Sequence, residues 1–313
     1  MLKAFRPDVG KLQRLTPAAP LSDAVWIDLF APTDAEVATV NALGVEVPSL
    51  QDMEEIEISN RLYREGGVDY MTVVLSGHSE TDAPLSGPVT FILTPERLIT
   101  VRHHASRPFD TYPERADKVG PGCQSGEQVF LSLVEEVIGR LADLLENVGR
   151  GLDALSRTIF ANAAPKADLL QQALVRVGRE GELLGIIRLA LLTMERALGF
   201  FNPEKDADLR PVVAGLLRDI NALEVHTDFL SQRVGLASDA TIGMIGLSQN
   251  STVRIVSVVA VLFSPPTLIA SIYGMNFAHM PELAAGWGYP AALAGMLCSS
   301  LAAYLFFKWK NWL

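Results

Sequence analysis

The sequence predicts an α+β cytoplasmic domain with a long helical stalk, followed by two C-terminal transmembrane helices. Three observations support this fold class. Short β-branched apolar runs separated by turn residues fill the first 120 residues, and apolar residues then recur every three or four positions up to residue 254. The remaining chain contains two long runs without a charged residue. We therefore expect three domains, at 1–120, 121–254 and 255–313.

The composition excludes several functional classes. The chain has 313 residues, 49% of them hydrophobic, and a net charge of −10. A nucleic-acid-binding protein needs a basic surface, which argues against this class for so acidic a chain. The two cysteines, Cys123 and Cys298, are too few and too far apart for a disulfide scaffold or a cysteine-rich zinc module.

Four apolar runs in the first domain predict strands, at Ala24–Phe30, Val68–Leu75, Val89–Leu93 and Arg97–Val101. Thr94–Arg97 has the composition of a hairpin turn. Thr33–Glu36 matches a capping box and opens a short helix that ends near Gly44. His103-His104 is predicted to be a surface pair and not a metal site, because no cysteine or patterned acidic residue lies near it in the sequence.

From Glu127 onward the pattern is helical. Glycines and a proline between Lys118 and Gly126 mark the boundary with the first domain. Two helical stretches are separated by a connector at Ala163–Ala167. A third stretch begins at Leu209 and enters the first charge-free run without a stop signal, which predicts a rigid stalk continuous with a membrane helix.

The two charge-free runs, Ile255–Tyr273 and Tyr289–Phe307, have 19 residues each. At about 1.5 Å per residue each would span roughly 28 Å as a helix, close to the thickness of a bilayer's hydrocarbon core. The alternative is a pair of core helices in a large soluble protein, which two consecutive runs of this length disfavour.

The charges that flank the runs predict the orientation. Arg254 precedes the first run and Lys308 follows the second, whereas the connecting segment 274–288 contains no lysine or arginine. Basic residues concentrate on the cytoplasmic side of membrane helices. Both termini are therefore expected in the cytoplasm, segment 274–288 outside, and the protein in the inner (plasma) membrane.

Two helices cannot enclose a pore, so conduction would require several copies of the chain. The first span is the candidate lining helix, because residues at helical spacing form a polar, then apolar, then small and polar stripe. The predicted pore-lining residues are Asn250, Val253, Val256, Ala260, Ser264, Thr267 and Ser271. Helix packing through small residues is an equally good interpretation of this spacing. The second span carries Ala291, Gly295, Ser299 and Ala303 four apart, which predicts a packing role.

The motif Gly274-Met275-Asn276 follows the first span directly, with Met280-Pro281-Glu282-Leu283 shortly after it. At this position, between two C-terminal spans, the motif resembles the signature of the CorA magnesium-transporter family. The basic and aromatic ending Lys308–Leu313 is similar to that family as well. The resemblance implies a homopentameric channel whose first span lines the pore, with apolar constrictions at Val253, Val256 and Ala260.

Gly274, Met275 and Asn276 are the predicted selectivity filter. Magnesium holds its water tightly, so a site that binds the hydrated ion avoids a costly dehydration. A ring of Asn276 carbonyl groups would accept hydrogen bonds from those waters and still release the ion. Without the family context a helix C-cap would explain Asn276 equally well. Glu282 is either a ring of acids that concentrates cations at the mouth or a solvated loop residue.

The resemblance also implies that intracellular magnesium, bound between neighbouring cytoplasmic domains, closes the channel. The candidate regulatory ligands are the acidic residues Asp52, Glu54, Glu55, Glu57, Asp219, Glu224 and Asp228. Any one of them could instead belong to a solvated helix face.

No motif of an ATPase, a hydrolase or a metalloprotease is present in the sequence, so we expect no enzymatic activity. The predicted function is passive influx of Mg²⁺, and of Co²⁺ and Ni²⁺, through a channel gated by cytoplasmic Mg²⁺. The expected partners are other copies of the chain, the lipid bilayer and divalent cations, with no cofactor beyond Mg²⁺ as the transported and regulatory ion. The alternatives are a zinc transporter of the same superfamily, which Met275 and the Met280–Leu283 loop disfavour, and a non-conducting membrane-anchored sensor.

Overall fold

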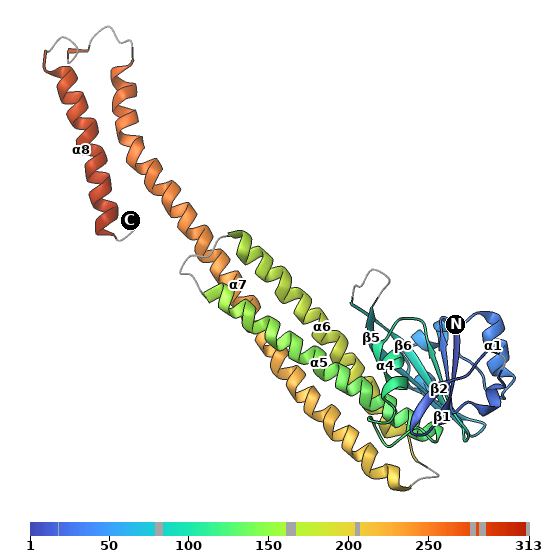
Figure 1. Ribbon diagram of the computed structural model, residues 1–313. Coiled ribbons are helices and arrows are strands. Elements are labelled where there is room, and N and C mark those ends of the chain that lie inside the picture. The colour runs from blue at the N-terminus through green and yellow to red at the C-terminus, as the bar shows by residue number, and fades with distance from the viewer. Residues whose placement is uncertain are drawn as a thin grey trace. The chain divides into compact units, whose positions relative to one another are not determined.

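The computed structural model describes residues 1–17, 19–78, 84–160, 167–203, 207–275, 280–281 and 286–310. The chain forms two compact units (Figure 1). The first consists of Met1–Arg157 and Val175–Ser238, and the second of Thr158–Leu174 and Asp239–Leu313.

A seven-stranded mixed sheet forms the N-terminal part of the first unit (Figure 1). Its strands are β1 (Leu2–Asp8), β2 (Lys11–Arg14), β3 (Trp26–Phe30), β4 (Leu62–Glu65), β5 (Val68–His78), β6 (Pro84–Leu93) and β7 (Leu98–Arg102). Their order in the sheet is β2-β1-β3-β7-β6-β5-β4. The β3–β7 pair is parallel and every other pair is antiparallel.

The four predicted strands correspond to β3, β5, β6 and β7, whereas β1, β2 and β4 were not predicted. The turn between β6 and β7 is confirmed, since the backbone N–H groups of Thr94 and Arg97 each find a partner across it: Thr94 N donates to Arg97 O at 3.0 Å, and Arg97 N donates to Thr94 Oγ1 at 3.0 Å. The capping box at Thr33 and Glu36 is also confirmed, at the start of α1 (Asp34–Asn41).

Helices cover both faces of the sheet. Besides α1, the short elements are η1 (Leu21–Asp23), α2 (Leu50–Glu54), α3 (Ile58–Arg61) and α4 (Arg107–Arg115). Adjacent residues of β3 enter different cores, because side chains alternate across a strand. Ile27 joins the core that contains Val40 of α1, whereas Trp26 joins the core that contains Phe130 and Met194 of the long helices.

Two polar networks are built into this part of the molecule. The carboxylate of Asp28 pairs with the Arg102 guanidinium at 2.9 Å, and both side chains are almost fully buried. Thr100 Oγ1 donates to the same carboxylate at 2.9 Å. In the second network, β5 extends past the end of β4, so that Val74 has no partner on β4. Its N–H donates instead to Thr193 Oγ1 of a long helix at 3.0 Å. These bonds satisfy polar groups that would otherwise be buried without a partner.

Three long helices follow the sheet. They are α5 (Gly126–Phe160), α6 (Ala167–Phe200) and α7 (Arg210–Tyr273), with the short η2 (Ala207–Leu209) before α7. The connector predicted at 163–167 lies outside the described residues except for Ala167, which begins α6. Within the first unit, Arg233 of α7 pairs with Asp153 of α5 at 2.5 Å, and Arg188 of α6 pairs with Asp228 of α7 at 3.0 Å.

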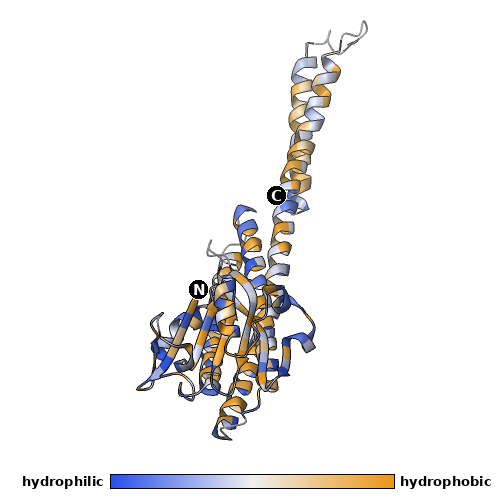
Figure 2. Ribbon diagram, turned by 90° about the vertical axis from the view of Figure 1, so that its right-hand side faces the viewer, coloured by the Kyte–Doolittle hydropathy of each residue, from blue (hydrophilic) through white to orange (hydrophobic). Residues whose placement is uncertain are grey.

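The predicted continuity of stalk and membrane helix is confirmed. Helix α7 has 64 residues without a break, equivalent to about 96 Å at 1.5 Å per residue. Its C-terminal part and α8 (Gly288–Trp309) are both long and apolar enough to cross a membrane. Figure 2 shows hydrophobic colouring along both of these segments, in contrast to the mixed colouring of the sheet and its helices.

Candidate functional site

In the second unit, α7 and α8 pack as an antiparallel hairpin. Ser300 Oγ of α8 donates to the Leu262 carbonyl of α7 at 3.4 Å. This carbonyl lies four residues before Pro266, which has no N–H to offer it, so α8 provides the partner that the proline removes. Closer to the segment that joins the two helices, a Cβ on Gly295 would lie 3.9 Å from Ile269 Cδ1. This would be an ordinary van der Waals contact, so the helices also pack against each other here.

All seven predicted pore-lining residues lie on α7, and all seven side chains are exposed in the single chain. The residues of α7 that face α8 are different ones: Val258 is buried and Leu262 is half-buried. Ala260 and Ser264 each follow one of these by two positions, which is about 200° around a helix. The predicted stripe therefore lies on the side of α7 opposite to α8 and is free to face other copies of the chain.

The small-residue face of α8 is largely directed at α7. Gly295, Ser299 and Ala303 are half-buried, whereas Ala291 is exposed. This distribution agrees with the packing role predicted for the second span.

The predicted filter begins where α7 ends. Gly274 N donates to Ala270 O at 2.9 Å, and Met275 N donates to Ile272 O at 3.2 Å, so the last turn tightens at the motif. A Cβ on Gly274 would lie 3.2 Å from the Ala270 carbonyl oxygen, tighter than ordinary contact. Asn276 and Glu282, the other predicted residues at the mouth, lie outside the described residues.

The predicted regulatory acids of the sheet domain lie on α2 and the segment after it, and all four are exposed. Asp52 already accepts hydrogen bonds from the Ser49 side chain and backbone, which lower the pKa of its carboxyl. Glu55 accepts a hydrogen bond from Asn60. Glu54 and Glu57 complete this group.

On the stalk, the structure brings Glu224 and Asp228 of α7 together with Glu195 of α6 around a cavity of about 390 Å³. Partial burial raises the pKa of Glu224, and the negative charges of Glu195 and Asp228 raise it further, whereas the Arg188 guanidinium, which pairs with Asp228, lowers it. No sequence pattern pointed to Glu195, because the pairing of α6 with α7 decides its position. Asp219, the third predicted stalk acid, does not line this cavity. Among the described residues of this single chain, no three acidic, histidine or cysteine residues are arranged to hold a metal ion.

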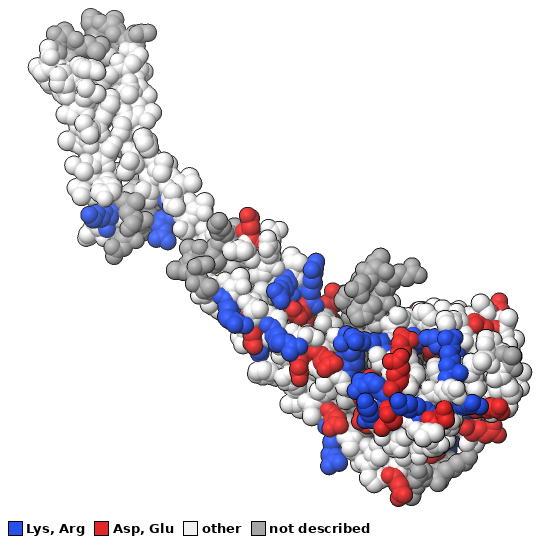
Figure 3. Space-filling model, viewed as in Figure 1, with Lys and Arg blue, Asp and Glu red and all other residues white. Residues whose placement is uncertain are grey.

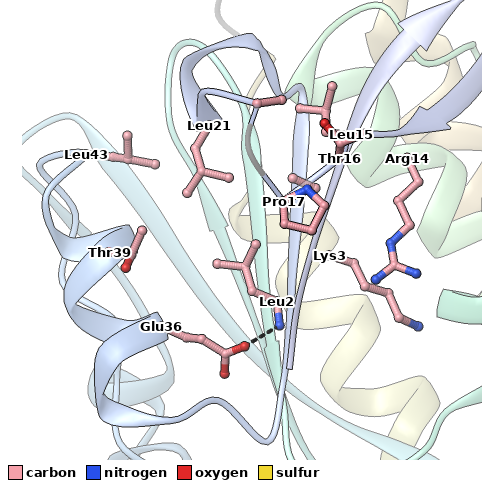
Figure 4. Close-up of a pocket in the computed structure, with 12 residues that line it drawn as sticks. Leu2, Lys3, Arg14, Leu15, Thr16, Pro17, Leu21, Glu36, Thr39 and Leu43 are labelled. Carbon is pink, nitrogen blue, oxygen red and sulfur yellow. Dashed lines mark hydrogen bonds between the residues drawn. The ribbon is translucent and has the colours of Figure 1, made fainter.

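Two other features lie away from the predicted site. A pocket of about 890 Å³ opens between β1, the segment after β2 and α1, with Leu2 N donating to Glu36 at 2.7 Å along one wall (Figure 4). It contains none of the predicted site residues.

The prediction that His104 lies at the surface is wrong: only 6% of the residue is exposed. Glycines on β5 and β6 leave room for its ring, and a Cβ on Gly87 would lie 2.6 Å from Nδ1.

Comparison with known proteins agrees with this architecture. Residues 22–309 match the family model described as CorA-like Mg²⁺ transporter protein. The chain is 35% identical to the magnesium transport protein CorA of Escherichia coli K12 and 36% identical to that of Salmonella typhimurium, and each alignment covers the full length of both proteins.

Solved structures share the fold. The complete CorA magnesium transporter of Methanocaldococcus jannaschii superposes with a TM-score of 0.75 at 17% identity, covering 100% of this chain and 99% of the other. The cytoplasmic domain of ZntB from Vibrio parahaemolyticus gives 0.56 at 12% identity, covering 77% of this chain and 96% of the other. The predicted fold class, a cytoplasmic α+β domain with a helical stalk and two C-terminal membrane helices, is confirmed.

Members of the matched family are transporters rather than enzymes, which agrees with the predicted lack of enzymatic activity. The match extends over strands β3 to β7, the stalk and both apolar helices. The chain therefore belongs to the CorA-like Mg²⁺ transporter family, as an inner-membrane protein with two C-terminal spanning helices and a large cytoplasmic domain.

Proposed function

We propose that this chain assembles as a homopentamer that forms a passive channel for Mg²⁺, with α7 lining the pore. The observation that carries the proposal is the exposed stripe on α7 opposite to α8. A face that runs from polar Asn250 through apolar Val253 and Val256 to small, polar residues suits an ion path better than a lipid contact. Influx needs no ATP, since a divalent cation gains about 4.6 kcal/mol on crossing 100 mV inward.

Selection of the hydrated ion takes place at Gly274, Met275 and Asn276. The close approach of Gly274 to the Ala270 carbonyl supports this, because it keeps the last turn of the pore helix tight directly below the motif. Five Asn276 amides would then form one ring of neutral acceptors for the water shell of the ion. Glu282 adds a ring of negative charge that raises the local cation concentration.

The gate lies at the cytoplasmic end of the stripe. Val253 and Val256 are each 63% exposed on α7 and would meet their copies around the pore axis, with Ala260 above them. An apolar constriction of this kind closes a pore by excluding water. Asn250 forms the polar ring on its cytoplasmic side.

Cytoplasmic Mg²⁺ closes this gate by binding acidic residues between neighbouring subunits. The raised pKa of Glu224 supports a cation-binding role, because a cation would relieve its repulsion from Glu195 and Asp228. A complete site needs carboxylates from a second copy, and the candidates are Asp52, Glu54, Glu55, Glu57 and Asp219.

The test is ion flux into liposomes that contain the purified protein. Asn276→Ala is expected to abolish Mg²⁺ uptake while the oligomer stays intact in size-exclusion chromatography. Asn221→Ala is the matched control, since Asn221 is exposed on α7 and bonds only to its own helix at Leu217 O. Normal uptake by an assembled Asn276→Ala variant would contradict the filter assignment.

The same liposomes distinguish the ions and the alternatives. We expect Co²⁺ and Ni²⁺ to enter as well, and internal Mg²⁺ to suppress all three fluxes. The likeness of the cytoplasmic domain to that of ZntB keeps a zinc transporter as the second candidate. Zinc flux without Mg²⁺ flux would favour that candidate, and no flux of any ion would favour a non-conducting sensor.

A further inference from the structure

Three basic residues gather at the cytoplasmic ends of the two membrane helices. Figure 3 shows the visible face of α8 and of the apolar part of α7 free of charge, except for Lys and Arg atoms at these ends. The residues are Arg254 of α7, Lys308 in the last turn of α8 and Lys310 directly after it. We refer to them as the basic belt.

The packing of the hairpin places the basic belt at one depth. Ser300 of α8 is bonded to Leu262 of α7. Lys308 lies eight residues after Ser300, and Arg254 lies eight residues before Leu262. Because the helices are antiparallel, both steps run toward the cytoplasm and cover about 12 Å. The two cations therefore lie level with each other on adjacent helices.

This depth corresponds to the lipid headgroups. From Arg254 to the end of α7 at Tyr273 the helix rises about 28 Å, close to the roughly 30 Å of a hydrocarbon core. Just above the belt, Val258 and Phe307 are buried, and Ile255 and Phe306 expose 63% and 52% of their surface. Apolar surface thus begins directly where the positive charge ends.

No acidic side chain of the described residues pairs with the basic belt. Along α7 the nearest described acid is Asp239, 15 residues away, which is about 22 Å and more than two Debye lengths at physiological salt. Lys310 Nζ lies 5.1 Å from the ring centre of Trp309, whose side chain is 76% exposed. An exposed tryptophan next to unpaired cations is typical of residues that lie among headgroups.

We propose that Arg254, Lys308 and Lys310 bind the phosphate of an anionic glycerophospholipid in the cytoplasmic leaflet. The three cations supply the counter-charge, and the exposed apolar surface above them accommodates the acyl chains. A free phosphate ion would satisfy only the charges, which is why the lipid is the better occupant. This inference rests on the two membrane helices and not on which ion the protein transports.

The experiment measures lipid preference beside Trp309 in the full-length protein. Trp287→Phe/Trp312→Phe leaves Trp309 as the membrane reporter, since Trp26 is fully buried in the sheet domain. The reporter protein is reconstituted into phosphatidylcholine vesicles with increasing dibrominated phosphatidylglycerol or dibrominated phosphatidylcholine. Fluorescence quenching by each gives the relative association constant of the two lipids.

The expected preference for phosphatidylglycerol is about a hundredfold, since each cation near an anionic lipid contributes about fivefold, or about 1 kcal/mol. In Arg254→Gln/Lys308→Gln/Lys310→Gln the preference is expected to fall to about one. The matched control removes three exposed basic residues elsewhere, Arg107→Gln/Lys118→Gln/Arg218→Gln, and keeps the hundredfold preference.

Three results would overturn the proposal. A preference near one in the unmutated reporter protein would mean that other groups, such as acidic side chains of a neighbouring copy, occupy the belt. A preference unchanged in the triple variant would exclude these three residues. Loss of the preference on adding millimolar inorganic phosphate would identify a site for a free anion. If the triple variant does not assemble, the single variant Lys308→Gln must show the fivefold loss and Lys308→Arg must not.

Discussion

Replacing His104 by glutamine is expected to flatten the acid sensitivity of the cytoplasmic domain. The pKa of His104 is lowered from 6.5 to about 4, chiefly by burial and also by the neighbouring Arg102 guanidinium, whereas a hydrogen bond with the Leu75 backbone opposes the shift. Its Nε2 atom has no partner among the described residues. Protonation would therefore place an uncompensated cation in the core between two glycines.

The direction of the pH dependence follows from the pKa of His104 in the folded chain and its ordinary value in the unfolded chain. Between pH 6.5 and about 4 the unfolded chain holds the proton on this imidazole and the folded chain does not, so stability falls as the pH falls through that window. The gap corresponds to about 3 kcal/mol in total, of which about 2 kcal/mol is lost between pH 7 and pH 5. Above pH 7 the residue contributes no pH dependence.

The assay is urea unfolding of the full-length protein in detergent at several pH values, followed by the fluorescence of the buried Trp26. The membrane tryptophans are first replaced by phenylalanine, at Trp287, Trp309 and Trp312. His226→Gln is the matched control, because His226 is exposed on α7. If the free energy of unfolding falls equally between pH 7 and pH 5 with and without His104, the reasoning from burial is refuted.

Three further substitutions test the networks of the cytoplasmic domain, each read out as the free energy of unfolding in the same urea assay. Asp28→Asn leaves the buried Arg102 charge with only the half-exposed Asp110 carboxylate at 3.5 Å and is expected to cost about 3 kcal/mol; a loss below 1 kcal/mol would contradict the importance of the Asp28–Arg102 pair. Thr193→Val leaves the Val74 N–H without its acceptor and is expected to cost about 1–3 kcal/mol, whereas no loss would mean that another acceptor takes the bond. Glu36→Ala removes the capping box of α1 and is expected to cost about 1 kcal/mol, with an unchanged value as the contrary result.

Predictions from local pattern agreed best with the structure. The strands β3, β5, β6 and β7 are apolar runs that are buried in the sheet, and burial is what such runs signal. By contrast, β1, β2 and β4 are at or near the edges of the sheet, contain many charged residues, and are strands because a neighbour pairs with them. Helix α4 was missed because Pro113 lies inside it and proline is a poor guide to helix.

In the candidate site, too, some features follow from a local stretch of sequence and others depend on tertiary contacts. The membrane spans are contiguous in the sequence, so length and charge alone were enough to find them, whereas the role of Gly274–Asn276 was predicted from the resemblance to a known family. The partner of the Leu262 carbonyl and the position of Glu195 depend on residues that are distant in the chain.

The sequence by itself determined that two segments near the C-terminus cross the membrane, because exclusion of charge over the thickness of a bilayer is a property of one continuous stretch. Helical spacing also collected the seven residues of the stripe on one side of α7, yet the same spacing was equally compatible with packing against a neighbour. Only the tertiary structure showed that this neighbour is not α8, since α8 docks on Val258 and Leu262 and leaves the stripe exposed in the single chain. The burial of His104 likewise depends on glycines from two other strands, which no local pattern contains.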